Sequence, residues 1–301
     1  MADISRADVA TLIEDAYSHV LLDAAVAAST ALSTFPTVNM GTKTTHLPVL
    51  ATLPEADWVS ETENKPVTEV TWKSLTLVAE EIATIVPIHE NVLDDATVDL
   101  LTEITRRGGE AIGKKLDDAV LFGTDKPISW VSDSLCEAAV GASQTQTVTA
   151  GDANEDDLVG CVNQCAKTLA LAGFLPDTLV ASLALRYDVA NLRDADGNLA
   201  FRDNMFAGFN TSFNRNGAWD GTAAEILVVD SSRVRIGVRQ DIQVKYLDQA
   251  TLGSGETQVN LAQRDMVALR FKARFAYVLG VSTTSLGVDQ VPVAAVVPAG
   301  S

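Results

Sequence analysis

The residues best suited to acid–base chemistry in this chain surround His89, one of only three histidines. Glu90 follows it directly, and two further carboxylates, Asp94 and Asp95, come shortly after. A histidine that is oriented by a carboxylate can serve as a general base, so one hypothesis for this cluster is a hydrolase site. The same residues also suit a cap and turn before a helix, because short acidic side chains accept hydrogen bonds from free backbone N–H groups. The sequence favours this structural interpretation.

Motifs for metal binding and nucleophilic catalysis are missing from the sequence. None of His19, His46 and His89 has a second histidine four residues on, as an HExxH zinc site requires. Cys161 and Cys165 have the i, i+4 spacing of one helix face, and no histidine lies near them in the sequence, so packing is favoured over a zinc site. The chain also has no GxSxG, P-loop or dinucleotide-binding glycine motif. We therefore expect a protein that is not an enzyme and holds no metal or cofactor.

The charge of the chain argues against a nucleic-acid-binding surface. Its 301 residues include 22 Lys and Arg against 40 Asp and Glu, a formal net charge of −18, whereas DNA-binding surfaces cluster Lys and Arg against phosphates. The longest basic runs are the pairs Arg106-Arg107 and Lys114-Lys115. No secretory signal follows Met1, and no apolar run is long enough to span a membrane. We expect a soluble protein made in a reducing cytoplasm.

Two elements on either side of His89 dominate the sequence. Ile82 to Ile88 is a β-branched run that predicts a strand, and a short helical turn is expected from His89 to Leu93. A long amphipathic helix then runs from Val98 to Gly123, a residue free to adopt positive φ. The expected caps at the start of this helix are the side-chain oxygens of Asp94, Asp95 and Thr97.

Gly108 and Gly109 lie within the long helix and are weak helix formers, each costing about 1 kcal/mol relative to Ala. One interpretation is that another segment packs closely against the helix at these positions. The other is that the helix bends there. The sequence leaves both interpretations open.

The N-terminal part of the chain predicts an extended arm and a hairpin. Residues 4–33 predict one Ala-rich helix, and residues 37–43 a polar connector. Residues 44–80 hold two strand-like runs rich in Thr and Val, joined by a charged turn at 60–66. A two-stranded hairpin has too little core to be stable alone in water, so we expect it to lie on another surface.

The remaining chain predicts a mixed α/β region and a long returning strand. Residues 126–150 form a Ser-, Thr- and Gly-rich connector, and Phe201 to Gly221 a long loop. Ala262 to Val281 alternates as one long strand, followed by a loose tail of small residues. The other predicted elements are helices at 152–175 and 183–192 and strands at 178–182, 226–230, 234–238 and 242–247.

The order of these elements, together with four short stretches, carries a resemblance to a known family. The stretches are Pro87 to Ala96, Leu116 to Gly123, Leu183 to Arg186 leading into Asp194 to Asn198, and Val267 to Tyr277. The chain resembles the major capsid proteins of tailed bacteriophages that share the HK97 fold. The resemblance covers nearly the whole chain, and it is carried by the ordered set rather than by any one stretch.

This resemblance implies an α+β, HK97-like capsid fold with four parts. Residues 1–43 correspond to the N-terminal arm, and residues 44–80 to the extended E-loop, which in this family lies over a neighbouring subunit. The peripheral P-domain, with its long spine helix, comprises 81–125 and 262–301, and the axial A-domain comprises 126–261.

The same resemblance names the expected contact residues. At the E-loop tip, contact with a neighbouring subunit is expected from Trp58, Glu61, Glu63 and Lys65. The charged residues of that tip equally suit a solvated loop. For Gly108 and Gly109, the resemblance implies a bend in the spine helix that is used when the shell matures, and close helix packing is the alternative. Near the symmetry axis, the expected contact residues are Phe206, Phe209, Phe213 and Trp219.

One feature of some family members is not expected here. Those members join an E-loop lysine to an asparagine of the next subunit, with a glutamate as the base. Lys43 or Lys65 can supply the lysine, but Asp265 and Lys272 occupy the other two positions, and no asparagine occurs from Leu261 onwards. An isopeptide bond needs a carboxamide that expels ammonia. We therefore expect non-covalent contacts or separate cement proteins to stabilise the shell.

The implied function is that of a head-shell subunit. Pentamers and hexamers of the chain form an icosahedral shell in the virion, assembled in the bacterial cytoplasm, around double-stranded DNA that is not bound specifically. The implied partners are further copies of the chain, a separate scaffolding protein, a portal and a cement protein, without a membrane. An encapsulin-type nanocompartment shell of the same fold is the alternative, and a hydrolase using His89 is a more distant one.

Overall fold

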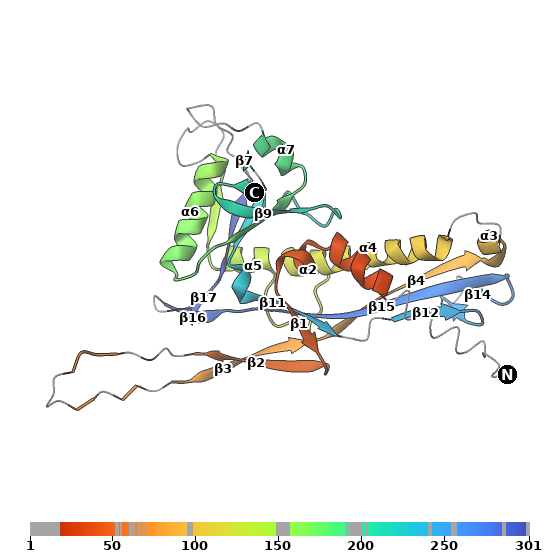
Figure 1. Cartoon of the computed structure of the whole chain (residues 1–301), viewed down its shortest axis with the longest axis horizontal. Helices are drawn as coiled ribbons and strands as arrows, with labels where there is room; N and C mark the ends of the chain where they lie inside the picture. The colour runs from red at the N-terminus through yellow and green to blue at the C-terminus, as the bar shows by residue number, and fades with distance from the viewer. Residues whose placement is uncertain are drawn as a thin grey trace, which may run out of the picture.

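The molecule is elongated, with two sheets arranged about a long helix and a hairpin that projects from one end (Figure 1). These features come from a computed structural model of the chain. The structure describes residues 19–51, 54, 56–59, 64–65, 67–68, 70–94, 99–148, 157–190, 192, 201–202, 204–239, 243–253, 258–284 and 287–298.

A five-stranded sheet runs along the molecule, with β15 (Met266–Leu279) at its centre. The predicted long strand is thereby confirmed. One edge of β15 pairs antiparallel with the full length of β4 (Glu80–His89). Along its other edge lie β11 (Val234–Arg239) and β12 (Gln243–Leu247), one after the other. Because β15 has partners on both edges, it is the strand that holds this sheet together.

The predicted long helix is confirmed as α4 (Leu100–Leu121), which packs along this sheet (Figure 1). It ends as expected, since Gly123 follows it with a φ of +75°. The predicted caps are wrong, because the N-cap is Asp99, whose side chain accepts a hydrogen bond from the backbone N–H of Thr102. Asp94 instead ends the short helix α3 (Glu90–Asp94), and residues 95–98 lie outside the described residues.

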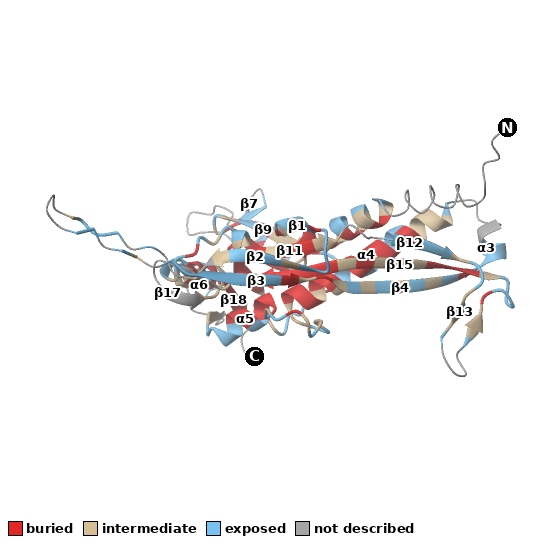
Figure 2. Cartoon of the chain, turned by 90° about the horizontal axis from the view of Figure 1, so that it is seen from below, coloured by how far each residue is buried: buried red, intermediate tan, exposed pale blue. Residues whose placement is uncertain are grey.

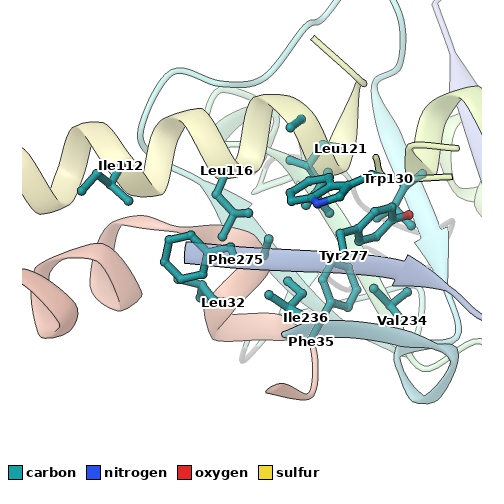
Figure 3. Close-up of a cluster of buried hydrophobic side chains, with 14 of the residues drawn as sticks. Leu32, Phe35, Ile112, Leu116, Leu121, Trp130, Val234, Ile236, Phe275 and Tyr277 are labelled. Carbon is teal, nitrogen blue, oxygen red and sulfur yellow. The ribbon is translucent and has the colours of Figure 1, made fainter. Parts of the chain in front are cut away.

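The main hydrophobic core lies between α4 and the sheet (Figure 3). Leu116 and Leu121 of α4 are fully buried together with Phe275 and Tyr277 of β15. Trp130 lies beside Tyr277, with ring centroids 5.9 Å apart. Both polar tips are satisfied, since the Trp130 indole donates to the Val78 carbonyl and the Tyr277 hydroxyl to the Asp133 carbonyl, each at 3.0 Å. The core is therefore aromatic at its centre and leaves no polar group of these two rings unpaired.

The second sheet has seven strands in the order β5-β18-β10-β6-β9-β8-β7. Its central strands β18 (Val293–Val297), β10 (Ile226–Val229) and β6 (Thr178–Ser182) are buried almost throughout, as expected where both faces of a sheet are covered. Alternate residues pack against α5 (Leu135–Gly141) on one face and α6 (Leu158–Leu171) on the other. The outer strands are β5 (Thr145–Thr147), β9 (Phe209–Asn214), β8 (Met205–Phe206) and β7 (Phe201–Arg202).

Three predictions for this second sheet are wrong. The expected loose tail contains β18, one of the most buried strands in the molecule. The expected connector at 126–150 holds α5 and β5, and the expected loop at 201–221 holds β7, β8 and β9. These elements are too short to show a clear period in sequence, and the small residues of β18 resemble a linker when their sheet neighbours are unknown.

The predicted domain boundaries do not follow the two sheets. β11 and β12 belong to the predicted A-domain segment, 126–261, yet they pair with β15 in the first sheet. β18 belongs to the predicted P-domain segment, 262–301, yet it pairs with β10 in the second sheet. Each of these two segments therefore contributes strands to both sheets, and the division into an A-domain and a P-domain stays a prediction.

The predicted hairpin is confirmed as β2 (Thr44–Leu50) and β3 (Trp72–Val78), which pair antiparallel over seven residues each. These strands span about 23 Å at 3.3 Å per residue. At the hairpin base, Leu77 is buried in a small cluster with Met40 and Val278. The remaining elements are α7 (Leu185–Ala190), the 3-10 turn η1 (Ser231–Arg233), and the strand pairs β13 (Thr251–Leu252) with β14 (Val259–Asn260) and β16 (Ser282–Thr284) with β17 (Gly287–Gln290).

Candidate assembly surfaces

The loop that joins β2 to β3 extends away from the rest of the molecule (Figures 1 and 2). Two of its described apolar side chains have no cover in their own subunit, since Trp58 is 103% exposed and Val67 is 94% exposed. Lys65 is also exposed, whereas Glu61 and Glu63 lie outside the described residues. An uncovered Trp on a projecting segment is typical of a surface that another protein covers.

The N-terminal arm packs against α4, the spine helix, and differs from the prediction of one helix over 4–33. Residues 19–28 are helical, the helix is interrupted at Ser29, and α2 (Thr30–Thr34) follows. The expected polar connector is also wrong, since β1 (Thr37–Met40) pairs in parallel with β11. Residues 1–18 lie outside the described residues. The arm is therefore fixed to the body at both the spine helix and the first sheet.

Glycines on the spine helix make this close approach possible. A Cβ at Gly109 would lie 2.6 Å from the Leu21 carbonyl oxygen of the arm, and one at Gly113 would lie 2.9 Å from the Ala25 carbonyl oxygen. Gly108 instead meets the Phe271 ring of β15 at 2.8 Å. These contacts support the close-packing interpretation of Gly108 and Gly109. A bend at these residues stays a prediction, and α4 continues through both of them.

The buried carboxylate of Asp117 lies on the same face of α4 as Gly109 and Gly113. It accepts hydrogen bonds from the arm at Ser29, where the helix of the arm is interrupted. Its oxygens accept hydrogen bonds from the Ser29 hydroxyl at 2.6 Å and from the backbone N–H groups of Thr30 and Ala31 at 2.8 and 3.0 Å. The side-chain amides of Asn214 and Asn216 donate at 3.2 and 2.8 Å. Burial raises the pKa of the Asp117 carboxyl, and these hydrogen bonds act in the opposite direction. One carboxylate thus joins the arm, the spine helix and the end of β9.

Sequence analysis did not single out Asp117, although a signal for it exists. Gly109, Gly113 and Asp117 are spaced four residues apart and therefore share one face of the helix. A glycine stripe that ends in an aspartate predicts close contact with a segment whose free N–H groups need an acceptor.

The aromatic residues predicted near the symmetry axis pack within their own subunit. Phe206 is only 1% exposed and lies in the core between the second sheet and α6, with Phe209 and Phe213 packed against that core. Trp219 meets the Phe122 ring edge-on with centroids 5.1 Å apart, and its indole donates to the Ala224 carbonyl at 2.9 Å. Phe206 is thus covered by its own chain, whereas Phe209, Phe213 and Trp219 are only partly buried, and their place near a symmetry axis stays a prediction.

Lys272, which occupies the position of the cross-linking glutamate in some family members, belongs to a cluster of ion pairs on the first sheet. Glu81 of β4 lies 3.0 Å from Lys272 and 3.3 Å from Arg274 of β15. The hydrogen bond from Lys272 is the main cause that lowers the pKa of Glu81. Asp265 lies in the turn before β15, where its carbonyl accepts from the Glu90 N–H at 3.0 Å. Lys43 lies 3.5 Å from Glu80.

The structure gives no support to the enzyme alternative. His89 is exposed at the end of β4, opposite Met266, and the side chains of Asp94 and Asp95 lie outside the described residues. Across the described ranges, His, Cys, Asp and Glu side chains nowhere gather in a group able to hold a metal ion. No helix in the described part of the chain is long and apolar enough to cross a membrane.

The cysteines pack as the sequence predicts. Cys161 and Cys165 are buried on α6 in the core of the second sheet, and Cys136 is buried on α5. Burial raises the pKa of the Cys165 thiol to about 12. A thiol with so high a pKa stays protonated at neutral pH and is a poor nucleophile or metal ligand.

An arm, a projecting hairpin, a long helix on a β15-centred sheet and a second α/β layer define the HK97-like class of shell proteins. Comparison with known proteins gives the same result. The chain belongs to the phage capsid family, whose model matches residues 12–281. Among curated proteins, none matches the chain.

Solved structures place the chain close to mycobacteriophage proteins. It is similar to a chain of Mycobacterium phage Cain, with 66% identity, a TM-score of 0.82 and 100% of both chains covered. A chain of Mycobacterium phage Adephagia shows 64% identity and a TM-score of 0.83, with 100% of this chain and 99% of that one covered. The capsid of an empty GTA particle shares the fold, at 17% identity, a TM-score of 0.62 and 89% of each chain.

The chain is accordingly a major capsid protein of a tailed phage, a structural protein of the virion that assembles with copies of itself into a shell. It is not an enzyme. Its identity to mycobacteriophage chains over its full length favours the phage head over the encapsulin alternative.

Proposed function

We propose that each subunit holds its neighbours through its extended segments, above all through the loop between β2 and β3. In this proposal the loop lies across an adjacent subunit within pentamers and hexamers of a closed icosahedral shell that encloses double-stranded DNA. The observation that carries it is the full exposure of Trp58 and Val67 on a segment beyond the body of the subunit.

Burial of these side chains provides the energy for the contact. Covering an aromatic side chain of this size contributes about 3 kcal/mol, and every subunit of a shell makes the contact once. The folding of the single subunit does not depend on these two side chains. The hairpin is anchored at its base by the buried Leu77 and by the hydrogen bond from Trp130 to the Val78 carbonyl. The hairpin is thus stable on its body while its loop remains available to a neighbour.

The geometry of the hairpin also suits a shell that needs both pentamers and hexamers. Its base is fixed on β15 through Leu77 and Val278, whereas the described residues of the loop add no strand pairing beyond Leu50 and Trp72. A contact carried on such a loop can be kept while the angle between two subunits changes. The same loop can therefore serve both kinds of ring.

We propose that the contacts between subunits are non-covalent. Asp265 and Lys272 stand where a cross-linking member needs Asn and Glu, and Lys272 is engaged with Glu81. Assembled particles boiled in detergent should therefore run as monomers, and a ladder of multimers would contradict this. A separate scaffolding protein, a portal and a cement protein remain proposed partners by family membership. The net charge of −18 suits packaged DNA that is not bound specifically.

The direct test is the double variant W58A/V67A, compared with I128A as a matched control. Ile128 is 102% exposed but lies on the body of the subunit after α4. Since exposed side chains contribute within about 0.5 kcal/mol to folding, both variants should keep the wild-type thermal unfolding curve. W58A/V67A should fail to form rings or shells at concentrations where wild type and I128A assemble, as measured by light scattering. Normal assembly of W58A/V67A would refute the proposal.

A further inference from the structure

A polar pocket of about 260 Å³ lies where the arm, β9 and α7 meet. Two guanidinium groups line it, Arg186 of α7 and Arg215 just after β9. Its other polar side chains include the hydroxyls of Thr30 and Ser212 and the amide of Asn204, and no acidic residue of the described chain lines it. Although the net charge of the chain is −18, the charged residues in this lining are both cations, and the rest are neutral polar or apolar residues, which points to an anionic ligand.

Neither guanidinium is neutralised by a carboxylate of the described residues. Elsewhere on the molecule, arginines such as Arg106 and Arg274 form ion pairs with glutamates at 3.0 to 3.3 Å. Arg186 instead stacks on the Phe213 ring, 5.7 Å from its centroid. The cation–π contact fixes the plane of the guanidinium and leaves its N–H groups available.

Arg215 is held in place by its two neighbours in the sequence. Asn214 and Asn216 both donate hydrogen bonds to the buried Asp117, at 3.2 and 2.8 Å. The backbone of Arg215 is therefore fixed on both sides, although its side chain is exposed. Asp117 itself is saturated by five donors behind the pocket wall, which limits its repulsion of an anion in the pocket.

The hydroxyl groups can donate as well. The Ser212 hydroxyl accepts a hydrogen bond from Thr34 at 2.8 Å, and the Thr30 hydroxyl accepts one from Asn214 at 3.1 Å. Each of these oxygens keeps its own proton for a further acceptor. Two guanidinium groups and two hydroxyls thus surround the pocket with donors from different elements.

We propose that this pocket binds a phosphate group. A carboxylate presents two oxygens in one plane, whereas a tetrahedral phosphate can accept hydrogen bonds from donors on several sides, as this pocket requires. Water occupies about 30 Å³ per molecule, so the cavity has room for one phosphate group and several waters. The site does not depend on how subunits contact one another, and it goes beyond the shell role of the chain.

The phosphate can belong to a nucleic acid or be free in solution, and the surroundings of the pocket bear on this. Arg215 also lines a larger groove of about 770 Å³ between the arm and α4, together with Arg106, Arg107 and Lys114 and with the acids Asp23 and Glu110. Arg106 is paired with Glu103 and Arg107 with Glu110, so Arg215 and Lys114 are the cations that this groove offers to a longer phosphate ligand. A ligand with successive phosphates can continue from the pocket into this groove. A DNA duplex should then bind tighter than inorganic phosphate, without sequence preference and with a steep dependence on salt.

The test is calorimetric titration of the full chain, wild type and variants in the same assembly state, with inorganic phosphate, with a short DNA duplex and with a glutamate-rich peptide. The variants are R186Q and R215Q, and the matched control is R233Q, because Arg233 also stacks on a phenyl ring, 5.8 Å from that of Phe174. We expect saturable phosphate binding at one site per chain, weakened at least tenfold in R186Q and in R215Q and unchanged in R233Q. Thermal unfolding of each variant shows whether it is folded. If only one of R186Q and R215Q folds, the titration of that variant alone tests the proposal.

The outcomes separate the sources of the phosphate. Phosphate binding that the duplex does not exceed identifies a free phosphate as the ligand. Tighter duplex binding that is lost in the same variants identifies nucleic acid. Binding of the peptide alone, binding of nothing, or phosphate binding unchanged in both R186Q and R215Q would overturn the proposal.

Discussion

At the scale of single residues, Asp117 has the clearest structural role. It is fully buried, and its five hydrogen-bond donors come from the arm and from the segment after β9. A carboxylate in this position replaces the water that those donors would otherwise need. The arm therefore depends on a residue 86 to 88 positions away in the sequence.

Replacement of Asp117 by alanine should destabilise the chain strongly. D117A leaves buried donors without an acceptor, and the expected loss is about 3 kcal/mol in the free energy of unfolding. Urea unfolding of the unassembled chain measures this loss. The matched control is D118A on the same helix, whose side chain has no hydrogen bond in the structure's described part and should change stability by less than about 1 kcal/mol. Equal effects of the two variants would show that the five contacts are not stabilising.

Glu81 should make a small contribution to stability that depends on pH. Its pKa in the folded chain is lowered, mainly by the hydrogen bond from Lys272. Its contribution is therefore complete above the ordinary pKa of 4.5 and is lost as the pH falls through the lower, folded value. Because the Glu81 side chain is 45% exposed and solvent screens the pair, the advantage of wild type over E81Q at neutral pH should be below about 1 kcal/mol.

Urea unfolding at a series of pH values tests the role of Glu81. The difference between wild type and E81Q should disappear in acid. The control E90Q changes an exposed glutamate at the start of α3, which no ion pair of the described chain engages, and should show no such trend. A wild-type advantage over E81Q that grows as the pH falls below 4.5 would contradict the assignment.

At the scale of elements, the contact between the arm and α4 is set by glycine. A Cβ on Gly109 would lie 2.6 Å from the Leu21 carbonyl oxygen and 2.8 Å from the Cβ of Ala24. Backbone atoms cannot move aside as the end of a long side chain can. The arm can therefore lie this close to the helix only where the helix has no side chain.

The substitution G109A should destabilise the chain even though alanine is the better helix former. The gain in helix propensity is about 1 kcal/mol, and overpacking against backbone costs about 1–3 kcal/mol, so we expect a net loss. G141A is the control, because Gly141 ends α5 and a Cβ there would meet nothing within 4 Å. Thermal unfolding should show a lower midpoint for G109A and an equal or higher one for G141A. A stabilised G109A would mean that the arm is not packed at this position.

Long elements could be predicted from the sequence, and so could the short strands β6, β10, β11 and β12, whereas α5, β18 and the strands β5, β7, β8 and β9 could not. β4, α4 and β15 repeat their pattern over enough residues to show a period, and each was found within a few residues of its observed bounds. β18, in contrast, is five small apolar residues whose burial depends on strands far away in the chain. The same limit explains the missed Asp117, since its partners come from segments that only the fold brings together.

At the scale of the whole molecule, the chain is built to be completed by its own copies. Its body has two well-packed cores, whereas the loop between β2 and β3 leaves Trp58 and Val67 uncovered. Ile128 on the body is equally exposed, but Trp58 and Val67 lie on a segment that projects from the body and can reach another subunit. The family assignment and this exposure lead to the same conclusion, that the functional unit is the shell.

The most direct test of this account is the mass of the particles that the chain forms when expressed alone. We predict closed shells, or discrete pentamers and hexamers, in light scattering and in negative-stain images of the same sample. The W58A/V67A variant should remain as folded single subunits under identical conditions. A wild-type chain that stays a compact monomer or dimer at high concentration would contradict the claim that its exposed hairpin drives assembly.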